Sequence, residues 1–249
     1  LATGGAQTAV PLSGPTVPIY PYASGRYSNG PVWTEYFANS LGLGLAPSLL
    51  GGNNYAFGGA RVAGASPVPT LQQQVGLYLS ANTVSANALY VIEGGGNDAR
   101  DVLDLVLSGQ DPTQRIADYV LGMVDMIGTL AGLGANHFLV WNITDLGLVP
   151  AVTAQGAAAA QGASNVVAAM NLLLTQALAA LPGSVTDDLI LFDAYAGLND
   201  IVANPAAYGL ADASTACAAD GPTLRTVNQL ARHSVRTPAL LLHNGRKLY

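Results

Sequence analysis

The sequence contains little charge, one lysine and one cysteine. Of its 249 residues, 9 are Lys or Arg and 15 are Asp or Glu, which gives a formal net charge of −6. Lys247 is the only lysine. The sequence therefore offers no basic surface that could neutralise phosphates, and we expect neither nucleic acid nor an anionic membrane surface as a partner. The hydrophobic content of 50%, combined with so few charges, excludes an intrinsically disordered chain.

Other features are missing as well. Because Cys217 stands alone, no disulfide can form within the chain, and no Cys/His zinc site is indicated. No apolar run reaches the roughly 18 residues that a membrane-spanning helix needs, so we expect no transmembrane segment. Residues 1–5 lack the basic and apolar regions of a signal peptide. Either such a peptide has been removed, or the sequence begins partway through a longer chain.

What the sequence does contain is a regular alternation of apolar strands and amphipathic helices. Apolar runs predict strands at 88–92, 137–143 and 189–192, with a brief additional strand at 54–57. Helical periodicity predicts helices at 31–41, 71–79, 112–133 and 157–181, and another that starts at Asn97. This alternation indicates an α/β fold with a parallel sheet between helices. We expect one domain over residues 1–249, opened by a surface loop at 1–30.

Three turns follow predicted strands, at 57–60, 94–98 and 142–145, and chemistry in open parallel sheets lies at the carboxyl ends of strands. The second turn, Gly94-x-Gly96-x-x-Ala99, formally matches a dinucleotide fingerprint, so nucleotide binding is one alternative. A second is that the glycines only turn a strand into a helix. A third places the side-chain amide of Asn97 and the backbone N–H of Gly59 in one oxyanion hole, because both follow strands at the same rim.

Several motifs that occur in a fixed order carry a more specific signal. They are Arg26-Tyr27-Ser28-Asn29-Gly30-Pro31-Val32-Trp33, Asn54-Tyr55-Ala56-Phe57-Gly58-Gly59-Ala60, Leu89-Tyr90-Val91-Ile92 with Gly94-Gly95-Gly96-Asn97-Asp98, Asp145-Leu146-Gly147 with Pro150, and Asn204-Pro205-x-x-Tyr208-Gly209. Together they resemble the GDSL branch of the SGNH hydrolases, which includes secreted and autotransporter esterases. The resemblance covers roughly residues 1–217.

This resemblance implies a three-layer, flavodoxin-like fold and hydrolysis of short- to medium-chain acyl esters by a Ser-His-Asp triad. It implies no cofactor, a small acyl ester as the binding partner, and a secreted, periplasmic or cell-surface location. Carried over by motif, Gly59 supplies an oxyanion N–H and Asn97 supplies the side-chain donor. The same two residues were paired above on the position of their strands alone.

The sequence departs from the family pattern at both ends. The family's nucleophile turn, Gly-Asp-Ser-Leu, and the strand before it have no counterpart here, so we expect a sheet without its first strand. The family's Asp-x-x-His-Pro box is replaced by a segment with His233 and Arg236, and arginine cannot act as a general base at neutral pH. The resemblance fades after Cys217, which resembles one half of a disulfide, and residues 218–249 form a divergent tail.

Other residues offer weak substitutes for the missing groups. Ser28 and Ser66 lie in loops near the rim, whereas the histidines are His137, His233 and His243. We expect no replacement triad from them, because His137 opens a strand at the opposite end of the sheet. Asp98, Asp101 and Asp104 recur every three residues, which fits either a cation site or a solvated helix face. A non-catalytic remnant of a hydrolase therefore stays open as an alternative to an active esterase.

Overall fold

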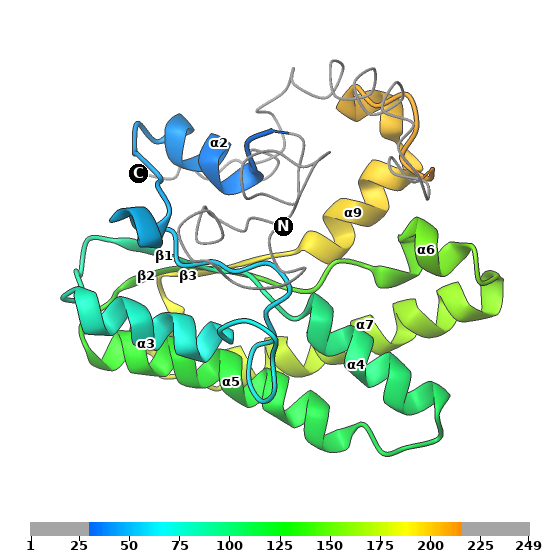
Figure 1. Ribbon diagram of the computed structural model, residues 1–249, viewed down its shortest axis with the longest axis horizontal. Helices are drawn as coiled ribbons and strands as arrows, with labels where there is room; N and C mark the ends of the chain where they lie inside the picture. Colours follow the sequence, from blue (N-terminus) through cyan, green and yellow to red (C-terminus); the bar gives the residue numbers. More distant parts are fainter. Residues whose placement is uncertain (1–29, 216–249) are drawn as a thin grey trace.

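The computed structural model describes residues 30–215, which form a parallel three-stranded sheet with helices packed around it (Figure 1). The strands are β1 (Leu89–Ile92), β2 (His137–Trp141) and β3 (Leu189–Phe192), and they lie in the order β1-β2-β3. Because both pairs are parallel, the chain must cross back over the sheet between strands, and helices make these crossovers. The predicted α/β fold with a parallel sheet is confirmed.

The strand register aligns side chains in rows across the sheet. Phe138 of β2 pairs with Tyr90 of β1 and with Leu189 of β3. This row belongs to the hydrophobic core, in which the Phe138 side chain is fully buried. Side chains alternate along a strand, so the next row, centred on the buried Leu139, faces the other side of the sheet. Burial on both faces explains why β2 reads as a continuous apolar run.

Four helices pack in the layer below the sheet in Figure 1: α3 (Leu71–Ala81), α4 (Gly96–Leu107), α5 (Thr113–Gly132) and α7 (Ala157–Ala179). The central helix of this layer is α5, which contacts α3, α4 and α7. Its buried residues recur at helical spacing and include Tyr119, Met123, Met126, Ile127 and Leu130. Together with the Phe138 side of the sheet they form most of the core.

On the opposite side of the sheet lies α2 (Trp33–Ser40) (Figure 1). The Trp33 ring stacks on Trp141 with 4.2 Å between the ring centroids, and Trp141 packs against Phe192 at 4.4 Å. The indole nitrogen of Trp33 also donates a 3.2 Å hydrogen bond to the Glu93 carboxylate. Trp141 and Phe192 are paired residues at the carboxyl ends of their strands. These contacts seat α2 over the rim and add the third layer of an α/β/α arrangement.

Shorter elements complete the described chain: η1 (Ser48–Leu50), η2 (Leu146–Leu148), α6 (Pro150–Thr153), α8 (Gly183–Thr186), α9 (Ala194–Ala203) and η3 (Pro205–Tyr208). Most predicted elements agree with the structure to within a few residues, but the predicted strand at 54–57 is wrong. Asn54 forms only an isolated bridge with Pro47. Its side-chain oxygen accepts a 3.0 Å hydrogen bond from the N–H of Ala56, and this local turn competes with strand pairing.

Among the described residues β1 lies at an edge of the sheet, because it pairs only with β2. On this edge strand Leu89 and Val91 are 39% and 37% exposed. The strand has none of the charges or prolines that protect ordinary edge strands. This composition suits an internal strand, and it agrees with the expectation of a sheet that lacks its first strand.

One helix in the described part of the chain, α7, is long and apolar enough to cross a membrane by length and composition alone. Its buried residues follow helical spacing and include Ala163, Val167, Met170 and Leu174. That stripe packs into the core, where α7 contacts α4 and α5. One face of α7 therefore belongs to the core, whereas Leu172 and Leu173 on the same helix are 57% and 41% exposed.

Candidate active site

The structure brings Gly59 and Asn97 together at the carboxyl rim of the sheet. Asn97 is the second residue of α4, which begins shortly after β1 ends. Its side-chain Nδ2 donates a 2.9 Å hydrogen bond to the carbonyl oxygen of Ala60, the residue that follows Gly59. A side-chain amide nitrogen carries two hydrogens, so one N–H of Asn97 remains beyond this bond.

Gly59 occupies a turn in which the N–H of Ala60 donates to the carbonyl of Phe57 at 3.3 Å. Its φ of +84° lies in the left-handed region that favours glycine. A Cβ at this position would meet no atom within 4 Å, so the backbone conformation, and not crowding, requires the glycine. The Gly59 N–H donates to no backbone or side-chain acceptor among residues 30–215. Within residues 30–215 the rim thus presents two N–H groups, one on Gly59 and one on Asn97, that have no acceptor.

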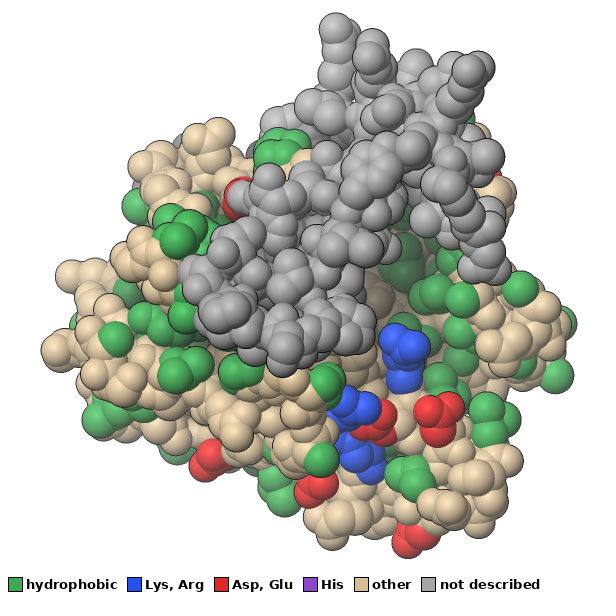
Figure 2. All heavy atoms as spheres, viewed as in Figure 1, with side chains coloured by type: hydrophobic (Ala, Val, Ile, Leu, Met, Phe, Trp, Pro, Cys, Tyr) green, Lys and Arg blue, Asp and Glu red, His purple; other side chains and the backbone are tan. Residues whose placement is uncertain are grey.

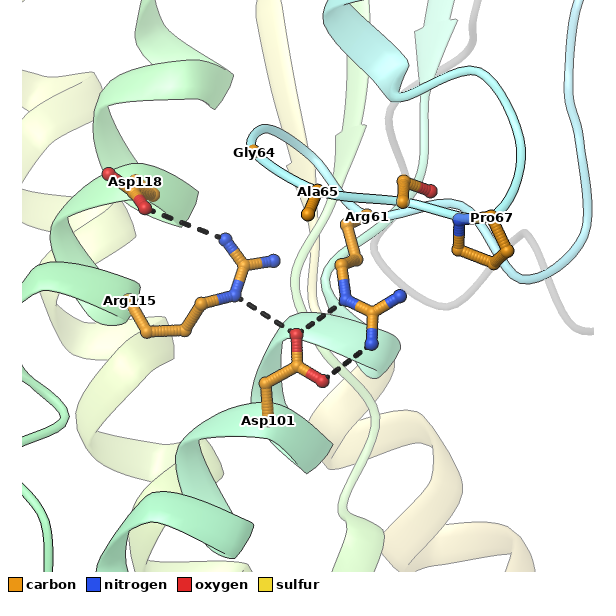
Figure 3. Close-up of a pocket in the computed structure, with 8 residues that line it drawn as sticks. Arg61, Gly64, Ala65, Pro67, Asp101, Arg115 and Asp118 are labelled. Carbon is orange, nitrogen blue, oxygen red and sulfur yellow. Dashed lines mark hydrogen bonds and ion pairs between the residues drawn. The ribbon is translucent and has the colours of Figure 1, made fainter.

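Four charged residues next to these donors form an ion-pair cluster, which we call the arginine clamp: Arg61, Asp98, Asp101 and Arg115. Arg115 Nη2 lies 2.5 Å from Asp98 Oδ1, and Arg115 Nε lies 3.1 Å from Asp101 Oδ2. Arg61 binds Asp101 through two bonds, of 2.5 Å from Nε and 2.8 Å from Nη2. Figure 3 shows both guanidinium groups directed at Asp101, one from α5 and one from the loop.

The two carboxylates of the clamp have different electrostatic environments. Asp98 is fully buried. Burial raises the pKa of Asp98, and the charge of Arg115 and the backbone N–H of Val62 oppose part of that rise. By contrast, the hydrogen bonds from Arg61 hold the pKa of Asp101 below its ordinary value, and they also raise the pKa of Arg61. Asp98 therefore needs Arg115 to stay ionised, and it needs it more than Asp101 does.

The described residues include three arginines and no lysine, and all three arginines gather on one face of the molecule (Figure 2). Two belong to the clamp, and the third, Arg100, is exposed on α4 and forms no ion pair within residues 30–215. A cavity of about 530 Å³ lies beside the clamp and is lined by Arg61, Gly64, Ala65, Ser66, Pro67, Asp101, Arg115 and Asp118. Gly59 and Asn97 do not line it, so this cavity is separate from the donor pair.

Neither sequence interpretation of the acidic spacing on α4 describes it fully. Asp98 is buried against Arg115, Asp101 is partly buried between two arginines, and Asp104 is exposed. The prediction of a solvated helix face is therefore wrong for Asp98, which is buried. Among residues 30–215, no group of three His, Cys, Asp or Glu side chains could hold a metal ion.

Packing explains the glycines of the turn before α4. Gly95 caps the helix with a φ of +109°, and a Cβ there would lie 2.5 Å from Tyr119 and 2.8 Å from Ile143. A Cβ at Gly94 would lie 2.5 Å from a methyl group of Leu71. Asp98, the acid that follows this turn, points toward Val62 and Arg115. The fingerprint-like spacing thus reflects close packing of the turn on α3 and α5 and requires no nucleotide.

The third turn, after β2, carries a network of hydrogen bonds that joins the strand to later elements. The side-chain nitrogen of Asn142 donates to Asp193 at 2.8 Å, and its oxygen accepts from the N–H of Tyr195 at 2.9 Å. The buried carboxylate of Asp145 accepts from the N–H of Gly147 at 2.9 Å and from the hydroxyl of Ser164 at 2.7 Å. These bonds fix the rim at the carboxyl ends of β2 and β3.

The structure does not assemble a triad from the substitute residues that it describes. His137 opens β2 at the opposite end of the sheet and lies 3.8 Å from Asp188. The hydroxyl of Ser66 is buried without a partner in the wall of the cavity beside the clamp. The other candidates lie outside the described residues: Ser28, His233, Arg236 and His243, as do Cys217, the predicted loop up to residue 29 and the tail at 218–249.

Comparison with known proteins identifies the family. The sequence model of the family described as GDSL-like lipase/acylhydrolase matches residues 2–233. The chain belongs to this family. A GDSL esterase/lipase of Arabidopsis thaliana is 28% identical over 80% of the chain, and a phosphatidylcholine-sterol acyltransferase of Aeromonas hydrophila is 28% identical over 79%. Lipase 1 of Photorhabdus luminescens is 30% identical over 59% of the chain.

These comparisons establish the GDSL, or SGNH, class of esterases and lipases that the ordered motifs indicated. The three-layer α/β fold that the resemblance implied is likewise confirmed. The chain spans only part of its relatives: the matches cover 63% of the Arabidopsis esterase/lipase, 57% of the Aeromonas acyltransferase and 25% of the Photorhabdus lipase.

The sequence interpretation missed Arg61 and Arg115. One signal for Arg115 was present, because it precedes the buried Tyr119 by four residues and so lies on the apolar stripe of α5. A charge on that stripe requires a buried partner of opposite sign. No comparable signal marks Arg61.

Proposed function

We propose that this protein is a serine-type hydrolase of short- to medium-chain acyl esters, and that the chain supplies the oxyanion-binding half of the site. The observation that carries the proposal is the pair of donors at the rim that have no acceptor among residues 30–215. Gly59 precedes Ala60, and the Ala60 carbonyl accepts a hydrogen bond from one N–H of Asn97, so the two residues belong to one small region of the rim. Two convergent N–H groups are what a tetrahedral oxyanion requires.

The surroundings of the donor pair favour negative charge. Asn97 lies in the first turn of α4, where the helix dipole and the free backbone N–H groups carry partial positive charge. Arg115 neutralises the carboxylate of Asp98, which follows Asn97. One donor of this kind typically contributes about 100- to 1000-fold to the rate of acyl transfer. No cofactor takes part in the proposed reaction, and the small acyl ester is the proposed ligand.

The nucleophile and the base are the remaining parts of the proposal. The Gly-Asp-Ser-Leu turn is absent from residues 1–249, and the segment at His233 and Arg236 departs from the family's acid and base box. We propose that the serine reaches the site on a strand placed beside β1, whose outer side has no partner among the described residues. A secreted or cell-surface location is proposed on family resemblance alone.

A product-like carboxylate tests the donor pair without any nucleophile. Hexanoate, titrated into the ¹⁵N-labelled chain, should shift the Gly59 amide signal and the Asn97 side-chain signals more than those of the distant His137 strand end. Asn97→Ala should abolish the saturable shift at Gly59. An unchanged spectrum of the wild-type chain at saturating hexanoate would overturn the proposed oxyanion site.

Hydrolysis separates the active enzyme from the alternative, a non-catalytic remnant that only binds acyl ligands. We propose to measure release of p-nitrophenol from p-nitrophenyl butyrate by the 249-residue chain and by a form extended with the residues encoded ahead of Leu1. Activity above a buffer blank that Asn97→Ala removes supports the hydrolase. If neither form exceeds the blank, the remnant is the correct description. A fluorophosphonate label that persists in Ser28→Ala and Ser66→Ala variants of the extended form would place the nucleophile outside both serines.

A further inference from the structure

Four consecutive residues after Gly59 are each tied to the start of α4 or to Arg115. The Ala60 carbonyl accepts from Asn97, and Arg61 forms an ion pair with Asp101. The backbone N–H of Val62 donates to both oxygens of Asp98, at 3.1 and 3.2 Å. The Ala63 carbonyl accepts a 3.3 Å bond from Arg115 Nη1. The loop that carries one proposed oxyanion donor is thus fastened to the helix that carries the other.

Arg115 is the element that connects these contacts. Its guanidinium reaches from α5 to Asp98, Asp101 and the Ala63 carbonyl, and its side chain is only 13% exposed. In Figure 3 it approaches Asp101 from the side opposite Arg61, with Asp118 beyond it. The guanidinium therefore occupies a defined position between two helices and the loop, which a more flexible side chain would not keep.

Charge gives Arg115 a second role. Asp98 follows Asn97 directly and is fully buried. Without a cation beside it, its negative charge would oppose any negative charge that forms at the neighbouring Gly59 and Asn97 donors. Arg115 lies 2.5 Å from Asp98 and cancels this charge at its source.

We propose that Arg115 is a positioning residue for the Gly59 and Asn97 site: it holds the loop against α4 and neutralises Asp98, so that the site accepts an anionic oxygen. This inference rests on the proposed function of the donor pair. Arg61 supports it by binding the other side of Asp101. No direct contact between Arg115 and a substrate is involved.

The test compares hexanoate affinity, measured by ¹⁵N NMR, across matched variants of the 249-residue chain. Arg115→Gln removes the cation beside Asp98, so that any charge kept by Asp98 is unpaired, and it should weaken hexanoate binding by about tenfold or more. Asp98→Asn combined with Arg115→Gln removes that charge while the Asn oxygen can still accept from Val62, so binding should recover most of the loss. Arg100→Gln removes one positive charge from α4, the helix that carries Asp98, but outside the clamp, and it should leave affinity within about twofold.

Three outcomes would overturn the proposal. The first is wild-type affinity in Arg115→Gln. The second is a double variant as weak as Arg115→Gln although its melting temperature has recovered. The third is an equal loss in Arg100→Gln, which would mean that only net charge matters. If Arg115→Gln does not fold, the hexanoate affinities of the double variant and of Arg61→Gln are compared with that of Arg100→Gln instead. Arg61 is 27% exposed.

A second readout separates failure of this proposal from failure of the proposed function. Hydrogen exchange of the Val62 amide and the chemical shift of the Asn97 side-chain amide report the fastening of the loop without any ligand. If the wild-type chain does not bind hexanoate, the oxyanion site is wrong. Faster Val62 exchange in Arg115→Gln than in Arg100→Gln would still show that Arg115 holds the loop, whereas equal exchange would refute that role as well.

Discussion

The side-chain amide of Asn97 donates a hydrogen bond of 2.9 Å to the carbonyl oxygen of Ala60, the residue next to Gly59. This bond joins two segments that are 37 residues apart in the sequence. It also orients the Asn97 amide, so that its oxygen cannot face the Ala60 carbonyl without repulsion. Both the structure of the loop and the proposed chemistry therefore require the Asn97 side chain to act as a hydrogen-bond donor.

Replacing the amide of Asn97 by a carboxylate should cost more stability than removing it. Asn97→Ala loses one partly buried hydrogen bond, worth about 1 kcal/mol, whereas Asn97→Asp places an anionic oxygen against the Ala60 carbonyl and should cost about 2 to 3 kcal/mol at pH 7. Urea unfolding measures both. Equal stability of the two variants would show that the amide is free to rotate away from Ala60.

Adding a methyl group to the turn before α4 should be tolerated at one glycine and not at its neighbour. Gly95→Ala combines a φ of +109° with a contact of 2.5 Å to Tyr119, and should lower the free energy of unfolding by about 3 kcal/mol. Gly96→Ala is the matched control, because a Cβ there meets nothing within 4 Å and helix α4 includes the residue. It should be neutral or stabilise by about 0.5 to 1 kcal/mol.

A comparable loss in both glycine variants would contradict the packing explanation. It would revive an alternative in which the whole turn needs glycine backbone freedom, as a phosphate-binding loop does. Melting temperatures with and without NAD(H) complete the comparison, and no shift is expected.

The stacked indoles should give a spectroscopic signal for the seating of α2 on the sheet. The sequence contains two tryptophans, and the rings of Trp33 and Trp141 lie 4.2 Å apart. Coupling between the two indoles should produce a paired positive and negative band in the far-ultraviolet circular dichroism spectrum. Trp33→Phe should remove this band pair while the helical signal stays. A wild-type spectrum without the band pair would mean that α2 does not rest on Trp141 in solution.

Stability should fall at alkaline pH partly through Tyr78. Burial and the nearby Tyr90 hydroxyl, 3.1 Å away, raise the pKa of Tyr78 to about 12 from an ordinary value of 10.0. Between these values the unfolded chain releases a proton that the folded chain keeps, so this contribution is complete below pH 10 and is lost as the pH rises toward 12. Tyr78→Phe should therefore show a shallower decline of melting temperature between pH 10 and 11.5 than the wild type.

The sheet and the place of Asn97 after β1 were predictable for the same reason. Strands buried on both faces read as apolar runs, and parallel strands end at one rim. Gly59 was assigned to that rim from a predicted strand at 54–57 that the structure does not contain. The short strand predicted at Asn54 failed because its side chain makes a local turn. Such competition depends on one rotamer, which hydrophobic periodicity does not report.

The arginine clamp lay beyond the sequence interpretation because its contacts join α4, α5 and a loop. Asp98 resembled an ordinary acid at a helix N-terminus, where exposure is the rule. Only the close approach of Val62 and Arg115 buries it. Pairwise placement of charges across elements requires the tertiary packing itself, whereas an apolar stripe is visible in one segment.

The side of β1 that has no strand partner within residues 30–215 has a consequence for the protein in concentrated solution. Its backbone groups and the exposed Leu89 and Val91 side chains offer a template on which another extended segment could add, and no lysine or proline of the strand discourages this. Four residues could therefore set the solubility of the entire 249-residue chain. Self-association should begin at this edge before the helical layers loosen.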